Sequence, residues 1–170
     1  MPHLQPGPLP TNALLTNYAN AGAYTDCFAT EIARTVSHAE FVETFYTGRL
    51  FKLERLLLGV LLSKPSTDRQ ARQLAAGELN EFAAWRVEAR AEDQLLLCAI
   101  DGRTRAWLMV SAAEEPGGTR RYFGSALLPP TNASTGNADK PKMGVLFKAL
   151  LGFHNRYSRA LLNSAARRVS

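Results

Sequence analysis

The sequence predicts an α+β fold, in which helices pack on an antiparallel sheet of about five strands. Three patterns support this. Between residues 85 and 128, hydrophobic residues alternate with period two in segments that short turn signals separate. In residues 37–62, hydrophobic side chains instead recur at the helical period of 3.6 residues. Residues 140–170 form one long amphipathic pattern, which is typical of a helix that covers a sheet.

The chain of 170 residues has the length of one domain. Residues 1–20 are rich in Pro, Asn and Gly without periodicity, which predicts a flexible N-terminal tail. Residues 21–170 then form the single domain. Residues 129–141 are poor in hydrophobic side chains and predict a mobile loop before the last helix.

The first half of the domain predicts one strand followed by two or three helices. Residues 24–32 are rich in β-branched and aromatic side chains, which favours a strand. A helix is expected from Ser37, where Ser37 and Glu40 have the spacing of a capping box, to about Gly48. A second helix is expected over residues 50–62, before Pro65.

A short third helix is expected from Thr67, which makes a second capping-box pattern with Gln70, to about Ala76. A four-strand meander follows, over residues 85–90, 94–100, 104–111 and 120–128. Asp101-Gly102 predicts a two-residue type I′ hairpin turn, in which both residues have positive φ.

The last helix has an apolar stripe that includes Met143, Leu150, His154 and Tyr157. Residues 140–170 also hold seven Lys/Arg and no Asp/Glu, whereas residues 1–139 hold 13 and 15, a net charge of −2. The charges fit a solvated helix face, or contact with phosphate, lipid headgroups or an acidic partner. The order of strand, helices, meander and long helix predicts a helix-grip fold, with the last helix packed across the sheet.

Four short segments, residues 82–88, 104–108, 117–120 and 149–154, carry a resemblance to a known family. They resemble the START and plant-allergen-like helix-grip superfamily, SRPBCC, and are similar to an SRPBCC-like domain of the kind also fused to atypical short-chain dehydrogenases. The likeness covers roughly residues 41–168. It implies a ligand cavity between the sheet and the last helix. The chain has no GxGxxG loop after a strand, so no NAD binding is expected, and no cofactor is predicted.

The candidate site residues are those that the fold would place near such a cavity. His154 is the candidate acid or base, because its ordinary pKa lies near neutrality; a hydrogen-bonded histidine at the core edge is the alternative. Arg105 shares a strand face with Trp107, where it could orient a carboxylate or phosphate, or simply stack on that Trp. The aromatic side chains could line a pocket or form plain core; they are Trp85, Trp107, Tyr122, Phe123 and Tyr157.

Partners and compartment follow from what the sequence lacks. Three His and two Cys without ligand spacing predict no metal site. Basic residues are not interleaved with aromatic ones as an RNA-binding sheet requires, so no nucleic acid is expected. Cys27 and Cys98 lie in apolar strand contexts, and residues 1–10 have no signal-peptide pattern, which favours the cytoplasm.

We therefore expect a domain that binds an apolar or amphipathic small molecule between the sheet and the C-terminal helix. Two alternatives remain open. One is a cyclase- or dehydratase-like enzyme that uses His154. The other is an interaction module whose basic last helix makes weak contact with an anionic membrane surface or partner.

Overall fold

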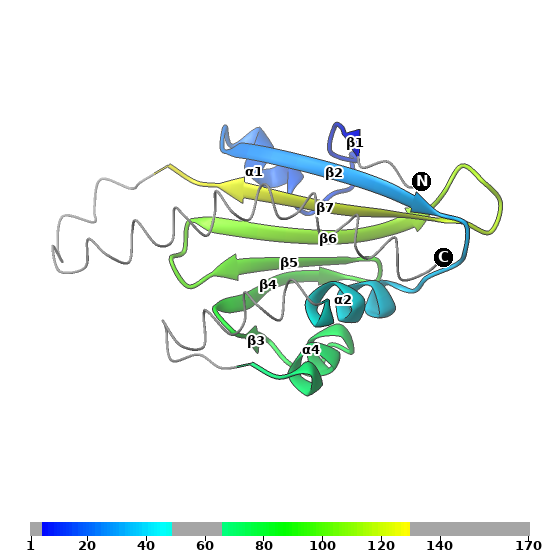
Figure 1. Ribbon diagram of the computed structural model, residues 1–170. Helices are drawn as coiled ribbons and strands as arrows, with labels where there is room; N and C mark the ends of the chain where they lie inside the picture. The colour runs from blue at the N-terminus through cyan, green and yellow to red at the C-terminus, as the bar shows by residue number, and fades with distance from the viewer. Residues whose placement is uncertain (1–4, 49–65, 130–170) are drawn as a thin grey trace, which may run out of the picture.

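The computed structural model describes residues 5–48 and 66–129 (Figure 1). These residues form an antiparallel sheet of seven strands in the order β1-β2-β7-β6-β5-β4-β3, with three helices packed beside it. The elements along the chain are β1 (Gln5–Pro6), α1 (Thr16–Asn20), β2 (Tyr24–Ile32), α2 (His38–Thr47), α4 (Asp68–Ala75), β3 (Glu81–Phe82), β4 (Trp85–Ala91), β5 (Gln94–Ala99), β6 (Thr104–Ala112) and β7 (Thr119–Leu127).

The α+β class and the antiparallel sheet are confirmed. The five long strands match the predicted strand and meander, and the two-residue strands β1 and β3 add edges that the sequence pattern did not indicate. The first long strand, β2, pairs with the last, β7, in continuous register from Tyr24 opposite Leu127 to Ile32 opposite Thr119. The predicted helix over residues 50–62, the long helix over 140–170 and most of the loop over 129–141 lie outside the described residues.

The two predicted helix starts differ in their caps. Thr67 and Gln70 form the complete capping box that opens α4. At α2, the Ser37 hydroxyl accepts a hydrogen bond from the Glu40 amide at 3.1 Å, as expected. The Glu40 carboxylate instead pairs with the guanidinium of Arg34 at 2.8 Å. The second predicted capping bond is therefore replaced by an ion pair, which a carboxylate prefers when a guanidinium is within reach.

The predicted type I′ turn at Asp101-Gly102 is wrong. Gly102 has φ +69°, but among the described residues other than glycine only Ala83 has positive φ. The connection from β5 to β6 is a four-residue loop, 100–103. Asp101 shapes it, because its Oδ1 accepts from the amides of Arg103 at 2.9 Å and Thr104 at 3.1 Å. This side-chain bonding supplies the turn without a left-handed Asp.

The sheet has two covered faces. We call the face that packs against α2 and α4 the helix face; its core includes Phe41, Phe45, Leu97, Leu108 and Phe123. The opposite face, which we call the N-terminal face, packs against residues 9–18, and its core includes Leu15, Leu96, Trp107 and Met109. In Figure 1, α1 lies behind the strands and α2 in front of them. Alternate residues of each strand serve the two cores.

Residues 5–20 do not fit the predicted tail, because they pack on the sheet. Leu15 is fully buried, and the side chain of Gln94 ties this segment to β5. The Gln94 carbonyl accepts from the Leu14 amide and from the Trp107 indole, both at 2.9 Å, and the Gln94 amide donates to the Asn12 carbonyl at 2.9 Å. The few hydrophobic residues of this segment lie among Pro and Asn without periodicity, so the hydrophobic pattern did not predict this packing.

Candidate functional site

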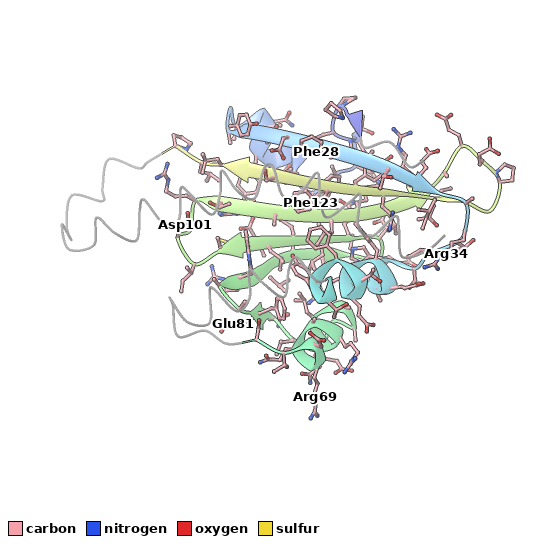
Figure 2. The ribbon with its side chains drawn as sticks, in the orientation of Figure 1. Phe28, Arg34, Arg69, Glu81, Asp101 and Phe123 are labelled. Carbon is pink, nitrogen blue, oxygen red and sulfur yellow. The ribbon has the colours of Figure 1, made fainter. Side chains whose placement is uncertain are left out.

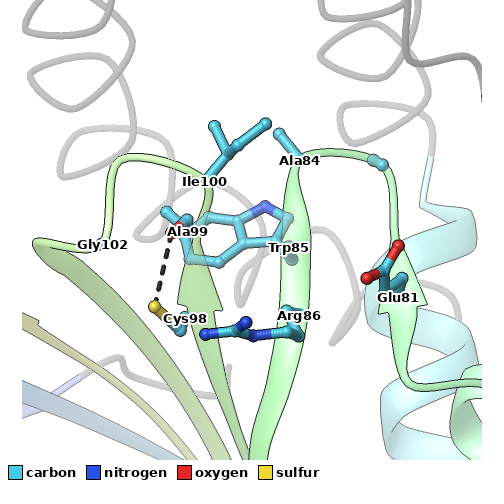
Figure 3. A pocket seen from close by; sticks show the side chains of 9 residues that line it. Glu81, Ala84, Trp85, Arg86, Cys98, Ala99, Ile100 and Gly102 are labelled. Carbon is cyan, nitrogen blue, oxygen red and sulfur yellow. Dashed lines mark hydrogen bonds between the residues drawn. The ribbon is translucent and has the colours of Figure 1, made fainter.

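A pocket lies at one end of the sheet, between two neighbouring connections. One is the two-residue turn Ala83-Ala84 between β3 and β4, and the other is the loop from Ile100. The Ile100 amide donates to the Ala84 carbonyl at 2.9 Å, which holds the connections together. The pocket encloses about 230 Å³ and is lined by Glu81, Ala83, Ala84, Trp85, Arg86, Cys98, Ala99, Ile100 and Gly102 (Figure 3).

The turn that forms one wall is strained. Ala83 has φ +52°, in the left-handed region where glycine is usual. For an alanine this conformation costs about 1–2 kcal/mol. Strain of this kind persists when the surrounding structure enforces it, and it is common at binding sites. Here the enforcing contacts are the β3–β4 pairing of Phe82 with Trp85 and the bond from Ile100 to Ala84.

The lining combines apolar surface with one cation. Trp85 and Ile100 supply the largest apolar side chains, and Ile100 is 62% exposed. Figure 3 shows the Arg86 guanidinium extending from β4 towards Cys98, its register partner on β5. Within the described parts of the chain, no carboxylate forms an ion pair with Arg86. The guanidinium can therefore bind an anionic group that enters the pocket.

The predicted site residues that the structure describes do not gather at one place. Trp85 lines the pocket. Trp107 and Tyr122 lie on the N-terminal face, where their ring centroids are 6.0 Å apart and Trp107 is fully buried. Phe123 belongs to the helix-face core and stacks on Phe45 with ring centroids 5.2 Å apart. His154 and Tyr157 lie outside the described residues.

Arg105 has neighbours that the sequence did not indicate. It shares the N-terminal face with Trp107, as expected, but its guanidinium lies over the Tyr18 ring, 5.0 Å from the centroid. Its Nε lies 2.6 Å from Glu88 Oε2 and 2.9 Å from the Tyr18 hydroxyl. Its Nη1 donates to the Gly102 carbonyl at 2.9 Å. Through these contacts, Arg105 links α1, β4 and β6. It is not among the residues that line the pocket.

Arg86 is a pocket residue that sequence reasoning missed. In the alternating pattern of β4 it occupies an outward position beside Trp85, and such positions are usually solvated arginines. Its role in the pocket depends on the β3–β4 turn, because that turn encloses the space beside it. The only sequence signal was its neighbour Trp85, which had been identified as a candidate wall of the site.

Comparisons with protein-family models, curated proteins and solved structures give no significant match. The resemblance to SRPBCC domains therefore stays a prediction. Within residues 5–48 and 66–129, no helix is both long enough and apolar enough to cross a membrane. The same residues contain no group of three or more His, Cys, Asp or Glu side chains placed to hold a metal ion.

Proposed function

We propose that this domain binds a small amphipathic molecule in the pocket at the end of β4 and β5. The observation that carries the proposal is the lining, in which Trp85 and Ile100 provide apolar surface beside Arg86, which forms no ion pair with a carboxylate of the described residues. Ligand sites are commonly apolar with one or two polar groups that fix the orientation of the ligand. The apolar body would pack between Trp85 and Ile100, and an anionic end would pair with Arg86.

The volume limits the ligand. Pockets for drug-sized molecules enclose about 300–1,000 Å³, and this one encloses about 230 Å³. The ligand is therefore a small molecule, or it inserts one end. The half-exposed rim at Ile100 is consistent with a ligand that enters from solvent.

The helix-grip fold belongs to the same proposal. The order of β2, then α2 and α4, then the meander β4–β7 supports it. In that fold residues 140–170 would form the long helix across the sheet, and the amphipathic stripe in their sequence supports this placement.

A fluorescence titration with 8-anilinonaphthalene-1-sulfonate, an aromatic anion, tests the pocket. We expect saturable binding at one site and about tenfold weaker binding by Arg86→Met, because a hydrogen-bonded charge contributes about 1.5–3 kcal/mol. Arg69→Met is the matched control, since Arg69 on α4 points away from the sheet (Figure 2). Equal affinity in all three proteins would exclude Arg86 from binding and reject the proposal.

Native mass spectrometry of protein purified from its host then identifies the ligand. A small molecule that stays bound to the wild-type protein and to Arg69→Met, but is lost from Arg86→Met, is the expected result.

A further inference from the structure

A cationic group other than Arg86 is buried on the helix face, apart from the pocket. Arg121 on β7 is only 2% exposed. Its Nε and Nη2 atoms are buried and donate to no acceptor among the described residues. Thr30 lies directly opposite on β2, is 4% exposed, and its hydroxyl is likewise buried without a hydrogen-bond partner. Two adjacent strands thus present unsatisfied hydrogen-bonding groups side by side.

The surroundings of Arg121 are apolar. The Phe41 ring lies 5.7 Å from its guanidinium carbon, Val110 is its register partner on β6, and Phe123 follows two residues later on the same strand face. Burial, and then the like charge of Arg34, lower the pKa of Arg121 to about 10. At neutral pH the side chain is still charged. An unpaired charge in such a setting costs several kcal/mol, because water that would solvate it is excluded.

The contact with Phe41 offsets only part of the free-energy cost of burying the Arg121 charge. A cation over an aromatic ring is attracted to the ring face. The hydrogen atoms on Nε and Nη2 instead point outward in the guanidinium plane, along one edge. That edge is the fork that binds both oxygens of a carboxylate in parallel hydrogen bonds.

We propose that Arg121 and Thr30 form a binding site for the carboxylate of a small organic acid with an apolar body. The Arg121 fork takes both carboxylate oxygens, and the Thr30 hydroxyl donates a further bond to one of them. One negative charge then balances one guanidinium. Phosphate fits less well, because it carries more charge and more acceptor oxygens than these donors satisfy. The apolar body lies among the aromatic side chains of the helix face.

This site is distinct from the pocket. Val110, opposite Arg121, is five residues along β6 from Arg105, which pairs in register with the pocket residue Cys98. At about 3.3 Å per residue this separation is roughly 17 Å along the strand alone. Both Arg121 and Thr30 are covered, so the acid reaches them only when neighbouring side chains move apart. The ion pair between the carboxylate and the Arg121 guanidinium favours this opening.

Thermal unfolding of the full chain tests the site, with sodium octanoate below its micellar concentration against sodium chloride at equal ionic strength. We expect octanoate to raise the unfolding midpoint of the wild-type protein in a concentration-dependent manner. Arg121→Met removes the fork and should abolish the shift, and Thr30→Val should reduce it. Arg120→Met is the matched control, because the neighbouring Arg120 pairs with Glu31 at 3.3 Å; it should keep the full shift.

The same measurement separates the alternatives. If Arg121→Met does not fold, Arg121→Lys keeps the charge without the fork and should lose most of the shift. No shift in the wild-type protein, or an equal shift in Arg121→Met, overturns the inference. So does an equal shift with inorganic phosphate, which would mean simple anion binding. A shift that Arg86→Met abolishes and Arg121→Met retains places octanoate in the pocket; it overturns this inference and leaves the proposed function intact.

Discussion

Arg105 Nε lies 2.6 Å from Glu88 Oε2, and the Tyr18 hydroxyl contacts both side chains. The Arg105 side chain is 10% exposed and that of Glu88 is 29% exposed. The ion pair therefore ties α1, through Tyr18, to β4 and β6. Removal of Glu88 would leave the largely buried guanidinium of Arg105 without its counter-charge.

Glu88→Gln should lower the free energy of unfolding by about 1–2 kcal/mol, since a stranded buried charge is costly but Glu88 is partly screened by solvent. Urea denaturation measures the change. Glu114→Gln is the control, because Glu114 is 89% exposed and only 3.9 Å from Arg120; its effect should stay within about 0.5 kcal/mol. Equal effects of the two variants would contradict a structural role for the Arg105–Glu88 pair.

Gly124→Ala should destabilise the protein by about 1–3 kcal/mol through overpacking. A Cβ at this position would lie 2.7 Å from the Asp26 carbonyl oxygen and 3.0 Å from side-chain atoms of both Leu15 and Trp107. Gly7→Ala is the matched control, since its Cβ would meet nothing within 4 Å. Thermal or urea unfolding compares them. If Gly124→Ala were as stable as Gly7→Ala, the close approach of residues 9–18 to the sheet would be wrong.

Ala83→Gly should stabilise the protein by roughly 0.5–1 kcal/mol, because relief of the left-handed alanine exceeds the added entropy of the unfolded chain. Ala84→Gly, one residue later, is the control. Ala84 is not among the positive-φ residues and is 6% exposed, so it gains no such relief and the variant should be less stable. If the turn has the described conformation, chemical denaturation should show a higher free energy of unfolding for Ala83→Gly and a lower one for Ala84→Gly, each relative to the wild-type protein. The same sign in both would contradict it.

Asp26→Asn should be more stable than the wild-type protein at pH 7. Burial raises the pKa of Asp26, although bonds from the Ser125 amide and hydroxyl at 2.8 and 2.7 Å oppose the shift. A raised folded-state pKa means that the stability contributed by the protonated form is present at low pH and is lost as pH rises through that pKa. Asparagine stays neutral and keeps an acceptor for Ser125.

The stability difference between Asp26→Asn and the wild-type protein should therefore shrink as the pH falls below the raised pKa of Asp26. Urea denaturation at a series of pH values from neutral to acid measures it. A gap that widens towards acid pH would mean that the ionised carboxylate stabilises the fold, contrary to the shift.

Much of the fold could be predicted because local chemistry determines it. Ser37 and Thr67 start helices through their own hydroxyl groups, and the alternation from Trp85 onward specifies strands without reference to distant residues. The Asp101 turn was predicted wrongly because its geometry depends on which amides the carboxylate reaches. Leu15 was missed because its burial depends on Gly124, a residue 109 positions away, rather than on a local period.

The candidate sites were harder to predict for the same reason. Arg86 becomes a pocket residue only when two turns meet beside it. Arg121 did carry a signal, since the alternation of β7 places it on the same face as Phe123 and therefore in the core. Whether a guanidinium in that position finds a partner depends on every element around it, and a sequence pattern contains no such information.

The pairing of β2 with β7 determines the order in which the chain can assemble. The contact between Asp26 and Ser125 spans 99 positions, whereas β4, β5 and β6 each pair with the next strand in the chain. Pairing of distant strands is slow, because the chain loses the entropy of loop closure before the stabilising contacts form. During synthesis at about 5–20 residues per second, β2 leaves the ribosome roughly 5–20 seconds before its partner exists. Until then nascent β2 has only the two-residue strand β1 beside it, and completion of the meander supplies the partner for its other edge.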